Sequence, residues 1–493
     1  IPRALLKDMG GFDPHFLPAY CEDTDLAFRV RQRGAKVYFQ PRSTVIHHEG
    51  VSHGTDTSSG IKAHQVTNQA KFLERWRSVL EYEQFVNAEL PFLARDRSQL
   101  KKTILVIDHY VPQGDRDAGS RTMCQFMSLF QKKGMSVKLW PENLWFDPVY
   151  TPRLQEAGIE VMYGPEYGGN FEKWIQENGA CIDYVLLSRP HISVQFIDSL
   201  RRFTDAPLIY YGHDIHHARL AAQISVGGWD ECVHLEMKRM AALEEKVWSM
   251  VDTIYYPSTL EVRFVEDWLR NRNLPSTKAF TIPVYAFESF PEKPERNLAD
   301  RVDLLFVAGF SHGPNGDAAI WFVREVLPII LVAAPELRLH LVGSNPTAAV
   351  RELAGPNVHV TGFVSDEELA AYYMSSRVAV APLRYGGGMK GKVVEAMRFG
   401  VPIVTSHAGA QGLDDALHFL AVSESPQDFA VEVLRLLRDD AEWLRVSIAS
   451  QKFARTRFSE EALWDVVSVD VDANEYSDVN VRRARVVKFK ERI

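Results

Sequence analysis

The chain has no long apolar segment, and no run of hydrophobic residues nears the roughly 18 that a membrane-spanning helix needs. It is poor in cysteine: Cys21, Cys124, Cys181 and Cys232 are too far apart for a Cys-x-x-Cys metal site and give no disulfide framework, which fits a reducing cytoplasm. A basic excess is also missing, since the formal net charge is −8 at pH 7. No basic stripe carries interleaved aromatic residues. These absences argue against an integral membrane protein and against nucleic acid as a partner.

The chain has the length and the apolar content for several folded cores. Its 493 residues are 46% hydrophobic, which suits a set of about three domains. The first residue is isoleucine, and the residues after it resemble neither a start nor a signal peptide. We therefore expect a piece of a longer chain.

Short apolar segments alternate with helical stretches from residue 103 onward. This βα rhythm predicts the α/β class, with parallel sheets covered by helices on both faces. A segment rich in proline and charge, 283–301, interrupts the rhythm and is typical of a hinge between two Rossmann-like domains. Strands are expected at 103–112, 137–140, 159–163, 184–190, 208–214 and 253–257 before the hinge, and at 303–310, 337–343, 358–362, 378–383 and 402–406 after it.

The pattern divides the chain into four segments. They are a first block at 1–98 that ends in a helical linker, a Rossmann-like domain at 99–290, a second at 291–467, and a tail without an assigned role at 468–493. Ligands of parallel sheets gather at the carboxyl ends of the strands, so the polar residues there are candidates for a site. In the first domain they are Asp108, His109, Asp115, Arg116, Gly119, Ser120, Arg189, His213 and Asp214.

Residues 378–402 carry the most informative pattern. An apolar, β-branched run is followed by a glycine-rich loop, RYGGGM, and by a helix that opens with two lysines. Glycines let backbone N–H groups approach an anion, the helix N-terminus adds partial positive charge, and Lys390 or Lys392 adds a full one. Glu395 lies one turn past Lys392, where its carboxylate can accept hydrogen bonds from a ribose diol. A buried strand with a surface helix of solvated lysines is the alternative.

This segment resembles the donor-binding region of retaining glycosyltransferases of family 4, which have the GT-B fold. The resemblance rests on G-x-K-V-V-E-A-M, then G-V-P-I-V-T, and then G-A-Q-G-L at 409–413. It implies that Glu395 binds the nucleotide ribose and that Lys392 meets the diphosphate. It also implies that the last helix, for which 442–466 is the candidate, crosses back onto the first domain.

Two positions depart from that family. Gly387 stands where many members carry a second glutamate, and Phe310 stands where many carry an arginine. Both departures affect how the sugar hydroxyls and the phosphate are held. They place more of the phosphate binding on Lys390, Lys392 and the loop that contains Gly387 and Gly388.

The family also implies residues on either side of the donor. A histidine at the end of a first-domain strand faces the transferred sugar there, and His213 is the match, with Asp214 able to orient it or to contact the acceptor. A strand-end histidine that is satisfied locally is the alternative. Gly119 and Ser120 lead a helix whose N–H groups can meet the donor, and a plain N-cap by Ser120 explains them equally well.

The loop GFSHGPNGD comes after the first strand of the second domain. In the GT-B plan His312 and Asn315 of this loop line the cleft under the nucleotide. A turn built by the Gly313-Pro314 pair explains both residues almost as well.

The first block, 1–98, resembles the C-terminal third of an inverting family 2 glycosyltransferase of the GT-A fold. Its sequence CEDTDLAFRVRQRG opens a helix with acids in the first turn, and a short strand and a histidine pair are expected next. The resemblance implies Asp23 as the catalytic base and His47 as a ligand of a divalent metal. Helix-capping acids and ordinary loop histidines are the alternative. The main metal carboxylates and the nucleotide-binding strands lie upstream in that family, so we expect a vestigial part without turnover of its own.

Together the resemblances imply a retaining glycosyltransferase that moves a sugar from a UDP-, GDP- or dTDP-sugar to a glycan or lipid-linked acceptor. Fused transferases of this kind suggest bacterial surface polysaccharide synthesis, such as that of O-antigen, in the cytoplasm with peripheral contact at the inner face of the membrane. Two alternatives stay open. One is a GT-B nucleotide-sugar epimerase or a glycogen-type phosphorylase. The other is a non-catalytic scaffold module of a larger polysaccharide synthase.

Sugar transfer by this chain should persist in excess EDTA. A GT-B site neutralises the diphosphate with helix N-termini and basic side chains, here Lys390 and Lys392, and needs no metal cofactor. A GT-A site needs a divalent cation for the same task, and here only His47 is left of its ligands. Release of the nucleoside diphosphate, measured with EDTA and with added manganese, checks this. Activity that EDTA abolishes and manganese restores would contradict it.

Overall fold

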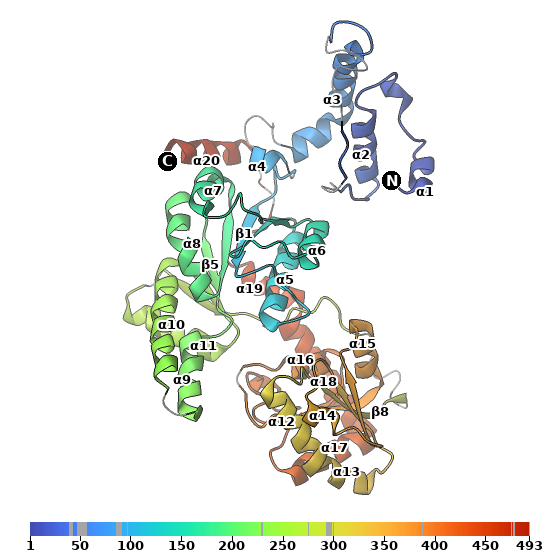
Figure 1. The fold of residues 1–493 in the computed structure, drawn as a ribbon, viewed down its shortest axis with the longest axis vertical. Coiled ribbons are helices and arrows are strands. Elements are labelled where there is room, and N and C mark those ends of the chain that lie inside the picture. Colours follow the sequence, from blue (N-terminus) through green and yellow to red (C-terminus); the bar gives the residue numbers. More distant parts are fainter. Residues whose placement is uncertain are drawn as a thin grey trace.

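The computed structural model describes residues 1–38, 43–46, 57–84, 91–95, 97–227, 230–274, 276–291, 298, 300–386, 388–474, 476 and 479–492. Two parallel sheets with helices on both faces lie one above the other, and a separate helical block holds the N-terminus (Figure 1). We call each sheet with its covering helices the first and the second domain. The α/β class and the pair of Rossmann-like units are thereby confirmed.

The first sheet has seven strands in the order β3-β2-β1-β4-β5-β6-β7, all paired in parallel. Leu105 and Ile107 point into one core, and Ile104 and Val106 point into the other. Because both faces are buried, the strands read as unbroken apolar runs. The strands are β1 (Thr103–Asp108), β2 (Ser136–Pro141), β3 (Glu160–Val161), β4 (Tyr184–Ser188), β5 (Leu208–Tyr211), β6 (Thr253–Tyr256) and β7 (Lys278–Thr281).

Helices cover this sheet on both faces. Ile197 and Trp248 bring α8 (Pro190–Phe203) and α10 (Glu231–Met250) onto one face, whereas Phe126 brings α5 (Ala118–Lys132) onto the other. Further helices are α6 (Tyr150–Ala157), α7 (Phe171–Asn178), α9 (His216–Gly227) and α11 (Thr259–Asn271).

The second sheet has the order β10-β9-β8-β11-β12-β13, again with parallel pairing. Val433 of α17 packs on one face, and Met397 of α16 and Ala454 of α18 pack on the other. The strands are β8 (Val302–Val307), β9 (Leu339–Val342), β10 (Val358–Gly362), β11 (Ser376–Ala381), β12 (Ile403–Thr405) and β13 (Ala421–Val422). The helices are α12 (Gly313–Trp321), α13 (Leu327–Ala333), α14 (Ala348–Arg351), α15 (Asp366–Ser375), α16 (Gly391–Arg398), α17 (Pro426–Arg438) and α18 (Asp440–Phe458).

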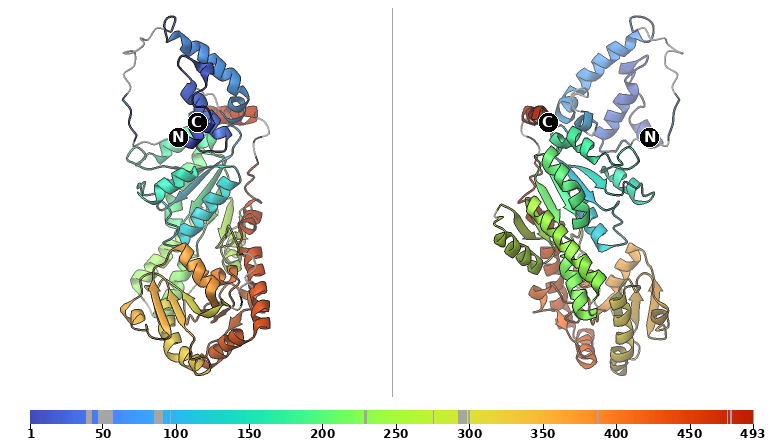
Figure 2. Two further views of the ribbon diagram at one scale, coloured as in Figure 1. Left: turned by 90° about the vertical axis from the view of Figure 1, so that its right-hand side faces the viewer. Right: turned by 60° about the vertical axis from the view of Figure 1, so that its left-hand side comes forward.

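The C-terminal helices return to the first domain. Leu463 and Val467 of α19 (Glu460–Val467) lie in one core of the first sheet. Val486 and Phe489 of α20 (Val479–Arg492) lie in the other. Figure 2 shows this path along both domains, with α20 at the end of the first domain that is farther from the second. The tail therefore closes a face of the first domain, a role that the sequence did not reveal. The segment boundaries at 98, 290 and 467 stay predictions.

The N-terminal block is helical. Phe16, Phe72 and Trp76 form its small core, and the Trp76 indole N–H donates to the buried Asp25 carboxylate at 2.9 Å. The described residues of this block contain no strand, so the short strand expected before His47 is not formed at 35–38 or 43–46. A strand needs a partner, and the described residues of the block supply none. Its helices are α1 (Arg3–Asp8), α2 (Glu22–Gln32), α3 (Ala63–Glu83) and α4 (Pro91–Ala94).

Arg482 is the polar centre of the contact between α20 and the first domain. Its side chain is completely buried, and Nη1 donates to the carbonyl oxygens of Ser98 and Lys101, each at 2.5 Å. Nη2 lies 3.3 Å from the Asp183 carboxylate. One side chain thus ties the C-terminal helix to the segment that enters β1.

Arg482→Ala should lower the free energy needed to open α20 and β1 by about 3 kcal/mol, because it leaves the buried carbonyl oxygens of Ser98 and Lys101 without this donor and removes one of the cations beside the buried Asp183 carboxylate. Hydrogen exchange of the amides in these two elements, followed by mass spectrometry, measures this. Lys488→Ala, which removes an exposed cation from the same helix, should leave the exchange unchanged. Equal protection in Arg482→Ala and the unaltered chain would contradict the role of Arg482.

Candidate functional site at the carboxyl ends of both sheets

Two lysines meet at the start of α16. Lys392 Nζ donates to Asn315 Oδ1 at 2.6 Å and lies 5.7 Å from the centre of the Phe306 ring. Lys390 Nζ donates to the carbonyl oxygens of Gly386 and Gly388, at 3.0 and 2.6 Å. Burial lowers the pKa of each lysine to about 8, and Lys390 adds to the effect on Lys392. Two half-buried cations, held by carbonyl and amide oxygens, therefore flank the helix N-terminus.

The loop before α16 is shaped by glycine. Gly386 and Gly388 have φ of 124° and 73°, which side chains rarely adopt. Both turn their carbonyl oxygens to Lys390 and so hold the ammonium beside the helix N-terminus. The third candidate of this loop, Gly387, lies outside the described residues.

Glu395 sits one turn into α16 and is half-buried. Its carboxylate accepts no hydrogen bond from the described part of the chain. Burial raises the pKa of Glu395, while Arg121 and Arg398 favour its ionised form. A carboxylate with free acceptor positions beside a cationic helix N-terminus is suited to a diol.

The first turn of α12 supplies a side chain that links two parts of the second domain. Asn315 Nδ2 donates to the Gly309 carbonyl at 2.8 Å while its Oδ1 accepts from Lys392, so the side chain joins the residues that follow β8 to the first turn of α16. His312 is the exposed N-cap residue of α12 and makes no capping hydrogen bond with its side chain. Phe310 is buried against Phe306, with ring centres 5.8 Å apart, and serves the core. Positive charge at this edge therefore comes from the lysines.

His213 lies just after β5 at the carboxyl edge of the first sheet. Its Nε2 lies 2.8 Å from Ser188 Oγ, and its ring stands edge-on to Tyr211 at 4.7 Å. Burial, together with the nearby Arg189 and His216, lowers the pKa of His213 to about 3. The imidazole is therefore neutral at pH 7.

Gly119 lies against the His213 ring, where a side chain would be crowded. A Cβ on Gly119 would lie 3.0 Å from Arg189 Nη2 and 3.1 Å from His213 Cε1, closer than such contacts normally are. Asp117, not Ser120, is the N-cap residue of α5, and it accepts from Ser120 N at 2.7 Å and from Ser120 Oγ at 2.6 Å. The Ser120 donors are thus already used, whereas Gly119 lies close to the Arg189 guanidinium and the His213 ring.

Arg189 is one of the polar residues that the sequence placed at the carboxyl ends of the first-domain strands. Its Nε lies 3.0 Å from the buried Asp108 carboxylate, and it has φ of 64°, which is rare for a residue with a side chain. Burial raises the pKa of Asp108, and Arg189 acts in the opposite direction. Strained backbone of this kind is frequent at functional sites. The one signal in the sequence is a polar residue between a strand end and Pro190.

Asp214 does not orient His213. Its carboxylate pairs with His216 Nδ1 at 3.2 Å and with Arg219 at 2.7 Å. Glu244, which the sequence analysis missed, holds the same region: its buried carboxylate accepts from His216 N at 2.7 Å and lies 2.6 Å from His217 Nδ1. Burial raises the pKa of Glu244, but these hydrogen bonds prevail and lower it to about 2. Glu244 lies mid-helix, where no motif reveals such a partner.

The linker between the sheets brings both edges together. Thr122 Oγ1 of α5 donates to the Val284 carbonyl at 3.2 Å, and the next residue, Tyr285, places its hydroxyl 2.5 Å from where a Cβ on Gly391 would lie. Arg121, beside Thr122, is near enough to favour the ionised form of Glu395. The start of α5 and the start of α16 therefore belong to one site.

The predicted residues of the N-terminal block lie elsewhere. Asp23 is exposed in the first turn of α2, where Oδ1 accepts from Thr24 N at 2.7 Å, and Figure 1 shows α2 far from α16. His47 lies outside the described residues. Within the described ranges, no group of three His, Cys, Asp or Glu side chains could hold a metal ion, and no helix could cross a membrane.

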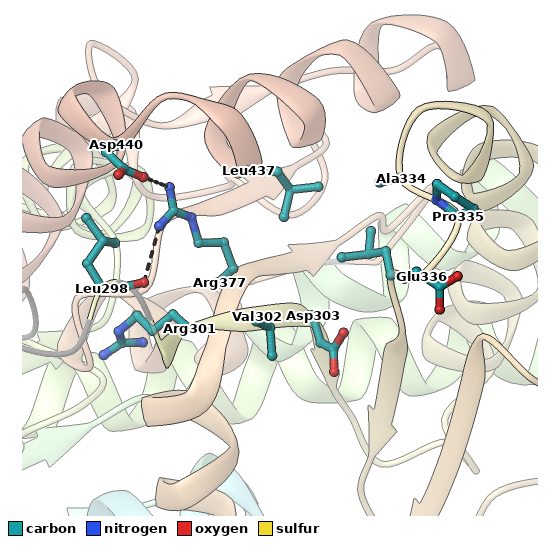
Figure 3. Close-up of a pocket in the computed structure, with 11 residues that line it drawn as sticks. Leu298, Arg301, Val302, Asp303, Ala334, Pro335, Glu336, Arg377, Leu437 and Asp440 are labelled. Atoms are coloured by element: carbon teal, nitrogen blue, oxygen red, sulfur yellow. Dashed lines mark hydrogen bonds and ion pairs between the residues drawn. The ribbon is translucent and has the colours of Figure 1, made fainter.

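A cavity of about 680 Å³ opens at the opposite edge of the second sheet, where its strands begin (Figure 3). Val302 and Leu437 line it together with Arg377, whose Nη2 pairs with Asp440 at 2.5 Å. None of its lining residues belongs to the lysine and glutamate cluster. This cavity is separate from the candidate site.

Comparison with known sequences points to the second domain. Residues 301–439 match the family described as Glycosyl transferases group 1. A Klebsiella pneumoniae protein described as an uncharacterized 44.6 kDa protein in the cps region is 25% identical over 143 residues, which cover 28% of this chain and 37% of that protein. The match therefore spans little more than a third of that relative.

Solved structures extend the likeness to both domains. Sucrose-phosphate synthase from Thermosynechococcus elongatus has a TM-score of 0.52 at 17% identity, over 75% of this chain and 98% of its own. Anabaena HepE in complex with UDP and glucose has a TM-score of 0.51 at 15% identity, over 75% and 98%. A glycosyltransferase from Rickettsia africae has a TM-score of 0.52 at 14% identity, over 75% and 97%. At these identities the likeness shows the fold, which is GT-B.

The affinity for a diphosphate should fall as pH rises through about 8. The two lysines have a pKa of about 8 instead of 10.5, so folding releases protons between these pH values. A bound anion favours the charged ammonium form of both lysines, so anion binding takes up protons above pH 8, whereas folding releases them. The affinity therefore falls by up to about tenfold per pH unit for each lysine. Calorimetry with pyrophosphate at pH 7, 8 and 9 measures this.

Lys392→Arg is the matched control, because arginine keeps the charge through this range and the titration of pyrophosphate itself is common to both proteins. The variant should show a shallower decline with pH. The same pH dependence in both proteins would contradict the assignment of the decline to Lys392.

Proposed function

We propose that the chain is a retaining glycosyltransferase that takes its sugar from a nucleotide-diphosphate donor. The observation that carries this proposal is the start of α16. There the two half-buried ammonium groups of Lys390 and Lys392 flank a helix N-terminus, and the free carboxylate of Glu395 follows three residues after Lys392. A nucleoside diphosphate offers the matching groups, two phosphates beside a ribose diol.

The comparisons support this proposal. The family matched at 301–439 is one of glycosyl transferases, and HepE was solved with UDP, so UDP is our first candidate for the donor nucleotide. The relative from a cps region favours a role in bacterial polysaccharide synthesis, with a glycan or lipid-linked acceptor. That no metal cofactor is required follows from the resemblance to family 4. Retention and the family 4 assignment rest on the sequence resemblance.

The geometry suggests how the reaction proceeds. Lys392 and the N-terminus of α16 stabilise the negative charge that develops on the diphosphate as the bond between the anomeric carbon and the phosphate oxygen breaks, an effect of about 3 kcal/mol per well-placed donor. The acceptor oxygen bonds to the anomeric carbon, and its proton passes to the departing diphosphate. Neutral His213 contacts the sugar from the first domain, opposite Glu395. Residues 1–98 take no part in this step.

Glu395→Ala and Lys392→Ala should each weaken UDP binding by roughly 1.5–3 kcal/mol, because each removes a charged hydrogen-bonding group. Isothermal titration calorimetry with UDP measures the change. Lys452→Ala, which removes an exposed lysine of the same domain, should bind UDP like the unaltered chain. Unchanged affinity in both site variants, with the fold intact by circular dichroism, would overturn the proposed function.

A further inference from the structure

The loop after β2 exposes one large aromatic side chain. Trp145 is 68% exposed, whereas Trp140, which lies on β2 itself, is completely buried. In the described part of the chain the Trp145 indole makes no hydrogen bond and no ring contact. Because an apolar ring of this size gains free energy when another surface covers it, Trp145 is suited to contact a ligand.

The residues just before Trp145 are fixed to the end of β1. Glu142 N donates to the Asp108 carbonyl oxygen at 2.8 Å. Asn143 N donates to the His109 carbonyl oxygen at 3.2 Å, and its side-chain Oδ1 accepts from Trp145 N at 3.1 Å. The loop thus continues the pairing of β2 with β1 beyond the last residues of both strands.

The residues just after Trp145 are fixed as well. Asp147 accepts from Tyr150 N at 2.9 Å and from Gln113 Nε2 at 3.2 Å, which ties the loop to the segment before α5. Leu144 has φ of 49°, a left-handed backbone that persists only where the surroundings enforce it and that is frequent at ligand sites. A ring presented by such a fixed loop loses little conformational freedom when a ligand binds.

The surroundings of Trp145 are polar. Glu142 lies in the same loop, and Asp115 and Arg116 meet at the Tyr150 hydroxyl, at 2.5 and 3.2 Å. Carboxylates repel an anionic lipid surface, whereas they accept hydrogen bonds from hydroxyl groups. The C–H bonds on one face of a sugar ring also fit the electron-rich face of an indole. A saccharide therefore matches this surface better than a membrane does.

The Trp145 loop stands at the same edge of the first sheet as the candidate site. Strand β2, which leads into the loop, is separated from β5 by β1 and β4. Three strand spacings amount to about 14 Å. A single sugar is too small to span this width, whereas a chain of several sugar units spans it.

We propose that Trp145 is a stacking platform for a distal sugar of the acceptor, and that the acceptor is a saccharide chain several units long. The inference rests on the proposed function, because that function places the end of the acceptor that receives the new sugar in the candidate site. The contact of a glycan with Trp145 can be measured without a donor and without turnover.

Fluorine nuclear magnetic resonance of the full chain labelled with 5-fluorotryptophan tests the contact. The sequence has 10 tryptophans, so the Trp145 signal is assigned by its loss in Trp145→Phe. The probes are hexasaccharides and disaccharides prepared from capsular polysaccharides of Klebsiella pneumoniae, the source of the relative from a cps region. The hexasaccharides should shift the Trp145 signal, and vesicles of phosphatidylglycerol should leave it unchanged.

Calorimetry with the same saccharides tests the energetic consequence. The unaltered chain should bind the hexasaccharides roughly tenfold more tightly than the disaccharides, and Trp145→Ala should remove this advantage. Trp145→Phe should keep most of it. Phe12→Ala is the matched control, because Phe12 is an aromatic residue of the N-terminal block that is 59% exposed. All three variants should bind UDP like the unaltered chain.

Three outcomes would overturn the platform: a Trp145 signal that the hexasaccharides do not shift, a signal that the vesicles shift, and equal hexasaccharide affinity in Trp145→Ala and the unaltered chain. Any of these results in a chain that binds UDP would leave the proposed function intact. A shifted Trp145 signal in a chain that does not bind UDP would instead uphold the glycan contact and overturn the proposed function.

Discussion

The candidate site depends on one close contact between the domains, the packing of the Tyr285 hydroxyl on Gly391. No side chain fits at Gly391, because its Cβ would lie 2.5 Å from that hydroxyl. Tyr285 belongs to the linker, whose Val284 carbonyl is bonded to α5, so the same few residues touch the first turns of α5 and α16. Each parallel sheet gathers its strand ends at one edge. The contact at Gly391 makes a single site of the two edges.

The two lysine ammonium groups at this site destabilise the fold of the protein without a ligand. Lys390 and Lys392 both lose hydration, and their ammonium groups donate to carbonyl and amide oxygens, which carry only partial charge. A desolvated ammonium that dipoles alone compensate destabilises the fold and is frequent where an anionic ligand binds. Phe310 adds no charge because it fills the core beside Phe306. The positive charge is thus concentrated on two flexible side chains at one helix end.

The sequence predicted the fold well where strands are buried on both faces. β1 and β11 read as apolar runs for that reason, whereas β7 is a partly exposed edge strand and β13 has only two residues, and neither shows such a run. The site could be predicted in part. Lys392 and Glu395 stand in a local motif, and Arg189 was expected as a polar residue at a strand end. The pairing of Arg189 with Asp108 and the contacts of Glu244 join residues distant in sequence, and spacing carries no trace of such contacts.

The two domains supply different kinds of group, and the difference fits the chemistry of a glycosyl donor. The second domain contributes cations and a helix N-terminus, where negative charge grows on a departing diphosphate. The first contributes an imidazole that burial keeps neutral, with Arg189 already paired to Asp108. A cation beside the sugar would oppose the positive charge that develops at the anomeric carbon, whereas a neutral acceptor of hydrogen bonds does not. The buried Ser188 hydroxyl, 2.8 Å from His213 Nε2, holds this neutral ring at the carboxyl edge of the first sheet.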